Sequence, residues 1–236
     1  MPASVRWSEH KDHHPAVSAD VASSGDLGLS AEDVDVLQRT AFQLAGWPES
    51  PHPDGALRWV AANHRYNALL WEEEDQARRT DVPDAEIVKN KRAIDRYNQL
   101  RNDAIEAIDE TILSAVQDVA LQEDAWINSE TAGSIIDRLS INALKQHHMR
   151  LQLERTGVSQ SHRLSCAAKL ERLQQQREDL LECLDRLLRG MREGVCGYRI
   201  YRQFKMYNDP SLNPYLCGMK GSSPATTTTG QPALNS

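Results

Sequence analysis

Residues 91–113, KRAIDRYNQLRNDAIEAIDETIL, constrain the fold more than any other stretch of the chain. Its apolar side chains recur every three or four residues, which is the period of an α-helix with one buried face. That face consists of Ile94, Tyr97, Arg101, Ala104, Ile105, Ile108 and Ile112. The pattern predicts one long helix, from about residue 84 to 120, that carries a guanidinium on its buried side.

A polar stripe follows the apolar face of this helix. Its members are Lys91, Asp95, Asn98, Asn102 and Asp109. Asparagine and aspartate have poorer helix propensity than the Glu and Lys of an ordinary exposed helix face. We therefore keep two interpretations open: a hydrogen-bonded network or ligand site, and a solvated face with ion pairs.

An internal similarity links this helix to a later one. A shift of 76 residues (177 − 101 = 76) places residues 96–109 over 172–185, with six of fourteen positions identical. The agreement extends to the preceding turn, where Arg79-Thr80 meets Arg155-Thr156. This predicts an all-α protein with an antiparallel four-helix core built from a duplicated helical hairpin.

The remaining pattern divides the chain into a helical domain and two tails. Residues 1–28 and 218–236 lack periodicity and are rich in small polar residues, which predicts disorder. The single all-helical domain spans 29–217. It has an extra N-terminal helix after Ser30, hairpins at about 54–120 and 131–193, and an irregular arm at 194–217.

Composition excludes several classes of function. A net charge of −7 argues against nucleic-acid binding, and no apolar run approaches the roughly 20 residues of a membrane span. Without a secretion signal or CxxC spacing among the four cysteines, we expect a reduced, cytoplasmic protein. The chain lacks HExxH, P-loop, GxGxxG and GxSxG motifs. The histidines at 147–148 are preceded by Leu144 and Lys145 where the Glu-x-x-His motif of a di-metal bundle needs glutamate, so we expect no metal and no cofactor.

The first helices of the two hairpins present complementary groups. A shift of 75 residues, which aligns Asn67 with Asn142, places Asp75 over Arg150 and the two glutamates at 72–73 over the two histidines at 147–148. If these helices meet, acid faces imidazole and guanidinium. Either a structural ion-pair cluster or a ligand site with His148 as acid or base fits this pattern.

Several motifs together resemble a known family. They are Asn67-x-x-Leu70-Trp71-x-x-Glu74-Asp75-x-x-Arg78, Asp95-x-x-Asn98-Gln99-x-Arg101-Asn102-Asp103, NSET at 128–131, GSIIDRLS at 133–140, YRQFKMYNDP at 201–210, and Asn213-Pro214. Over about residues 58–216 the chain is similar to the bacterial domain of unknown function 4254 family. The resemblance implies an all-helical cytoplasmic protein, often encoded near glycosyltransferase or cell-surface polysaccharide genes. It implies no activity.

The first functional hypothesis is a buried polar site that binds an anionic sugar or phosphate compound, in cell-surface polysaccharide or related biosynthesis. The ligand-binding candidates are Asp95, Asn98, Arg101, Asn102, Asp137, Arg138, Lys145, Arg202 and Lys205, which supply positive charge and hydrogen-bonding groups. If a reaction occurs there, Glu74, Asp75 and His148 are the acid/base candidates. Whether the protein is an enzyme stays open.

The second hypothesis is a non-catalytic accessory or interaction protein for a biosynthetic enzyme such as a glycosyltransferase. It uses the Tyr- and Arg-rich segment 198–207 as its surface, because both residue types are favoured at interfaces. The same segment also fits an arm that seals one end of the bundle. A homodimer through one bundle face is compatible with either hypothesis.

Overall fold

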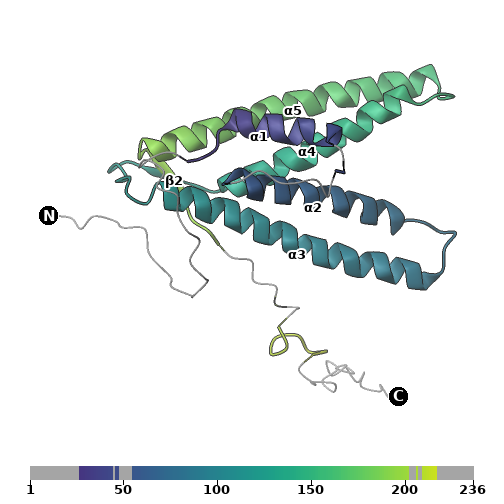
Figure 1. Cartoon of the computed structure of the whole chain (residues 1–236), viewed down its shortest axis with the longest axis horizontal. Coiled ribbons are helices and arrows are strands. Elements are labelled where there is room, and N and C mark those ends of the chain that lie inside the picture. Colours follow the sequence, from purple (N-terminus) through teal and green to yellow (C-terminus); the bar gives the residue numbers. More distant parts are fainter. Residues whose placement is uncertain (1–26, 45, 48–54, 202–205, 207–208, 217–236) are drawn as a thin grey trace, which may run out of the picture. The chain divides into compact units, whose positions relative to one another are not determined.

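Two helical hairpins dominate the first of the two units into which the chain divides, residues 1–200 and 201–236 (Figure 1). The structure is a computed structural model that describes residues 27–44, 46–47, 55–201, 206 and 209–216. The first hairpin pairs α2 (Leu57–Gln76) with α3 (Asp84–Ala115), and the second pairs α4 (Ala132–Glu154) with α5 (Gln160–Arg192). The short helix α1 (Ala31–Thr40) continues into a 3-10 turn, η1 (Ala41–Gln43), and contacts α2, α4 and α5.

Capping side chains fix where these helices begin. Ser30 and Asp33 form a capping box, in which the Ser30 hydroxyl accepts from Asp33 N and the Asp33 carboxylate accepts from Ser30 N. Thr131 and Ser159 accept backbone N–H groups at the starts of α4 and α5. Pro83 directly precedes α3, where its fixed φ and missing N–H suit a helix start.

The all-α prediction is confirmed, with one short strand pair that the sequence pattern did not indicate. β1 (Trp126–Asn128) pairs in parallel with β2 (Cys196–Tyr198). The pairing follows a turn at Gly194, where φ is +72° and an added Cβ would lie 2.3 Å from the Ala120 carbonyl oxygen. Only glycine fits such a position. α3 ends at Ala115, before the predicted end near residue 120.

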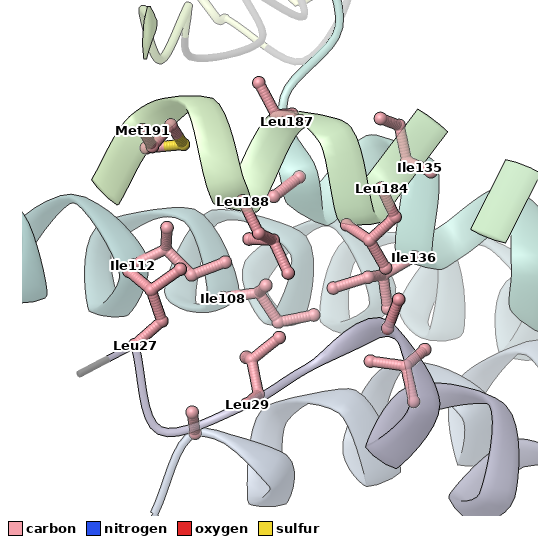
Figure 2. Packing of buried hydrophobic residues seen from close by; sticks show 14 of the residues in the cluster. Leu27, Leu29, Ile108, Ile112, Ile135, Ile136, Leu184, Leu187, Leu188 and Met191 are labelled. Atoms are coloured by element: carbon pink, nitrogen blue, oxygen red, sulfur yellow. The ribbon is translucent and has the colours of Figure 1, made fainter. Parts of the chain in front are cut away.

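The apolar core lies at the end of the helices that also holds β2, and Figure 2 shows how its side chains pack. It combines the last turns of α3 and α5 with the first turns of α2 and α4, and α1 and the residues just before it also contribute. Fully buried examples are Ile108 and Ile112 of α3, Ile136 of α4 and Leu184 of α5. Among the helices in the described residues, none combines the length and apolarity needed to cross a bilayer.

The duplication of the hairpin stays a prediction. α3 and α5 begin 76 residues apart (160 − 84 = 76), which equals the predicted shift. Two unrelated hairpins of similar length would also place their second helices about this far apart, so the spacing is equally compatible with separate origins.

A buried carboxylate joins α3 to the start of α4 in this core. Asp109, only 2 % exposed, accepts a hydrogen bond of 2.7 Å from the backbone N–H of Gly133. The backbones of α3 and α4 approach closely here: a Cβ on Gly133 would lie 2.6 Å from the Ile105 carbonyl oxygen. Tyr198 of β2 is fully buried, and its hydroxyl donates to the Asp109 carbonyl oxygen at 3.4 Å. The first residue of segment 198–207 therefore belongs to the core and cannot form an exposed interaction surface.

Burial raises the pKa of Asp109 from 3.8 to about 6, against the opposing effect of hydrogen bonds from Thr131, Gly133 and Tyr198. The folded protein therefore binds this proton more tightly than the unfolded chain does. The favourable contribution of the protonated carboxyl is complete below pH 3.8, is lost as pH rises to about 6, and stays absent above it.

We expect Asp109→Asn to raise the free energy of unfolding at pH 7.5 by about 1–3 kcal/mol, because the amide keeps an acceptor for Gly133 and carries no charge. The gain should shrink as pH falls from 6 to 4. Urea unfolding at pH 4, 6 and 7.5 measures it. Asp103→Asn, at an exposed position of the same helix, is the control and should change little. A variant with the wild-type pH dependence would contradict this account of Asp109.

Candidate functional site

A buried polar network joins α2 to α4. The side-chain amides of Asn63 and Asn67 both donate to Oδ1 of Asp137 at 2.8 Å. Asn67 also donates to the Ser140 hydroxyl at 3.0 Å, which in turn lies 2.8 Å from Nδ1 of His64. Asn63, His64, Asn67 and Ser140 are almost fully buried, so these hydrogen bonds replace contacts with water and fix how α2 lies on α4.

Arg101 reaches this network from α3. Its Nε lies 3.9 Å from Oδ1 of Asp137, the oxygen that already accepts from two amides. That Nε is buried and has no hydrogen-bond partner among the described residues. The side chains of Arg101 and Asp137 are 26 % and 13 % exposed. A partly buried guanidinium thus keeps donor capacity that no protein acceptor uses in full.

A cavity of about 330 Å³, termed here the smaller cavity, opens between α2, α3 and α4 beside Arg101. Neutral, acidic and basic polar side chains line it. They are the amides of Asn67 and Asn98, the carboxylates of Glu74 and Asp75, and the guanidiniums of Arg78 and Arg101. Positive and negative side chains are therefore present in equal number. Glu74 Oε2 lies 2.8 Å from Arg78 and 3.7 Å from Lys91, so this carboxylate is already engaged by cations.

Stacked rings run from the cavity wall into the bundle. Trp71 stacks on His148 with centroids 4.4 Å apart and planes 6° apart. His147 stacks in the same way on Phe42, at 4.2 Å and 4°. Phe42 then packs edge-on against His64 at 5.3 Å. Such packing holds the Trp71 and His148 rings in a defined orientation.

A second cavity of about 760 Å³, termed here the larger cavity, lies between α2, α4 and α5. Its charged and aromatic lining comes from Trp71, Asp75, Lys145, His148, Lys169 and Arg172. Three cations thus face one carboxylate. Trp71 and Asp75 line both cavities, so the two cavities are adjacent at the last turns of α2.

Burial keeps the histidines of this region in their neutral form. It lowers the pKa of His64 to about 3, with a further contribution from the Arg177 charge. Burial is also the main cause that lowers the pKa of His148, followed by His147, while Asp75 acts in the opposite direction. At neutral pH the His148 imidazole can therefore accept a proton or donate an N–H to a ligand, with the Asp75 carboxylate nearby.

The structure brings together most of the residues proposed from the sequence. Those that line one or both cavities are Glu74, Asp75, Asn98, Arg101, Lys145 and His148. Asp137 contacts Arg101 behind the smaller cavity, and Asn102 is buried on the same helix as Arg101. Of the groups aligned by the 75-residue shift, Glu73 accepts from Asn90 and Arg150 donates to Gln146, whereas the carboxylate near His148 is that of Asp75.

Four of the proposed residues are not placed with this group. Asp95 is exposed on α3, and Arg138 pairs with Glu130 at 2.7 Å with both side chains about half exposed. Arg138 belongs to the lining of neither cavity. Arg202 and Lys205 lie outside the described residues.

Comparison with known proteins assigns a family. Residues 57–200 match the family described as Protein of unknown function (DUF4254). The chain belongs to the DUF4254 family. This confirms the family resemblance drawn from its motifs. No curated protein and no solved structure matches the chain.

Sequence reasoning missed part of the site in this DUF4254 chain. Asn63, Asn67 and Trp71 are spaced four residues apart and share one face of α2, which is a signal that the helical period contains. His64 and Ser140 are separated by 76 residues, the shift already found between the hairpins, and they touch. Lys169 and Arg172 carried no signal, because exposed basic residues on a long helix are common.

We expect Asp137→Ala to lower the free energy of unfolding of this DUF4254 protein by about 2–5 kcal/mol, since it leaves two buried amides without their acceptor. Asp137→Asn keeps one acceptor oxygen and should cost less. Urea unfolding monitored by circular dichroism measures both. Asp103→Ala, on the exposed face of α3, is the control. Equal stability of Asp137→Ala and wild type would show that the network does not hold α2 on α4.

Proposed function

We propose that this DUF4254 protein binds an anionic small molecule, of the sugar or phosphate class, in the larger cavity. The observation that carries the proposal is the charge of its lining. Lys145, Lys169 and Arg172 outnumber the one carboxylate, Asp75, in a chain whose net charge is −7. A cation-rich cavity on an acidic protein concentrates positive potential at one place, which favours an anionic ligand.

The rest of the lining supports the same ligand class. Leu173 and Met149 supply apolar surface next to the Trp71–His148 stack, and Gln152 and Gln176 supply amides. Pockets that are mainly apolar with a few convergent polar groups are typical of small-molecule sites, and about 760 Å³ lies within the usual range of about 300–1,000 Å³. Exposed cations contribute only about 0–1 kcal/mol each, so binding needs the aromatic wall as well.

The proposal extends to a biosynthetic role, in cell-surface polysaccharide or related biosynthesis. Anionic sugar derivatives and phosphates are the small molecules that such a site would take. If chemistry occurs in the cavity, the neutral His148 imidazole and the Asp75 carboxylate are the groups placed for proton transfer. Glu74 is a weaker acid/base candidate, because Arg78 and Lys91 already engage its carboxylate.

A second candidate, an accessory protein for a biosynthetic enzyme such as a glycosyltransferase, is favoured by the second unit. Its described residues carry several exposed large apolar side chains: Tyr201, Met206, Leu212, Tyr215 and Leu216. Exposed aromatic side chains of this kind are favoured at interfaces. This candidate predicts that no small anion stabilises the bundle.

A thermal-shift screen with sugar phosphates, nucleotide sugars and inorganic phosphate distinguishes the two. A ligand at 100 times its Kd stabilises the folded state by about 2.7 kcal/mol, which for a chain of this size is a Tm rise of about 5–10 °C. We expect such a rise for wild type and a much smaller one for Arg172→Gln, which removes a cation of the larger cavity.

Arg186→Gln is the matched control, because it removes the same charge from an exposed position of α5 away from the cavity lining. Its shift should equal that of wild type. Equal shifts for the two variants, or no shift with any compound, would overturn binding at the larger cavity. The second result would leave the accessory role as the better account.

A further inference from the structure

The two cavities differ in chemistry although they share a wall. In the larger cavity cations exceed carboxylates by three to one, whereas in the smaller one two guanidiniums face two carboxylates and two amides. A free anion gains little from a wall of balanced charge. Hydroxyl groups, which both donate and accept, match such a wall well, because guanidinium and amide N–H groups donate while carboxylates and amide oxygens accept.

The protein does not supply a hydrogen-bond partner for every polar group in this wall, and Arg101 is the example. Its buried Nε lacks a hydrogen-bond partner among the described residues, and Asp137, 3.9 Å away, already accepts from Asn63 and Asn67. A partly buried guanidinium without full partners is costly. A ligand oxygen in the smaller cavity would supply an acceptor for the Nε–H of this side chain.

We infer that the smaller cavity binds a polyhydroxylated ring that is covalently joined to the anionic group in the larger cavity. This inference rests on the proposed function, and it narrows the ligand to a glycosyl phosphate. The phosphate faces Lys145, Lys169 and Arg172, and the ring lies against Asn98 and Arg101. The link between them passes Trp71 and Asp75, which line both spaces.

Size and shape agree with this division. The smaller cavity, at about 330 Å³, lies at the lower end of the range for ligand pockets, as expected for a subsite that takes one ring. Trp71 is held by its stack on His148, so the surface it offers at the junction is already ordered before a ligand arrives.

Isothermal titration calorimetry on the full chain tests the inference with two kinds of probe. The first is inorganic phosphate, and the second is a panel of glucose 1-phosphate, mannose 1-phosphate and N-acetylglucosamine 1-phosphate. We expect at least one glycosyl phosphate to bind ten or more times more tightly than inorganic phosphate does. Asn98→Ala should remove that gain without changing the affinity for inorganic phosphate, whereas Arg172→Gln should weaken both.

Gln99→Ala, at the exposed position next to Asn98, is the matched control and should keep the tenfold gain in affinity over inorganic phosphate. If Asn98→Ala does not fold, Arg78→Gln replaces it, because Arg78 lines the same cavity from an exposed position.

Each outcome of the titrations bears on a different claim. If inorganic phosphate binds at least as tightly as each of the glycosyl phosphates, the ring subsite is overturned and the proposed function stays intact. A gain that survives both Asn98→Ala and Arg78→Gln would also overturn the ring subsite. No binding of either kind of probe would overturn the proposed function together with this inference.

Discussion

The contact between α2 and α4 is the constraint on which the rest of this structure depends. Two buried asparagines converge on Asp137, and His64 meets Ser140 at 2.8 Å. Buried polar groups are costly when unpaired, so this set of hydrogen bonds allows one register between the helices and penalises others. The register places Trp71, further along α2, against His148 of α4, and Trp71 lines both cavities.

The apolar core and the two cavities occupy different ends of the bundle. The apolar cluster gathers at the end with the strand pair, where Ile108, Ile136 and Leu184 are fully buried. Towards the interhelical turns, asparagines, glutamines and charged residues replace aliphatic side chains in the interior. A protein can retain polar side chains inside its helices when an apolar core elsewhere supplies most of the folding free energy. The cavities lie in this polar part, where oriented donors and acceptors are available.

The polar stripe of α3 illustrates how far sequence reasoning reaches. Its members meet different surroundings along the helix. Asp95 is a solvated side chain, Asn98 lines the smaller cavity, and Asn102 and Asp109 are buried. The helical period placed these residues on one side of the helix but gave no information on which neighbour covers each turn. That depends on where α2 and α4 cross α3, which is decided by contacts far apart in the chain.

The sequence by itself determined the helices, their caps and the position of their turns, because these rest on interactions within a few residues. Ser30, Thr131, Ser159 and Pro83 are local signals, and all four mark helix starts in the structure. Only the tertiary structure decided the strand pair, the two cavities and the partner of each buried polar group. These arise from pairs such as Asn63 with Asp137, 74 residues apart, whose meeting depends on the packing of whole helices.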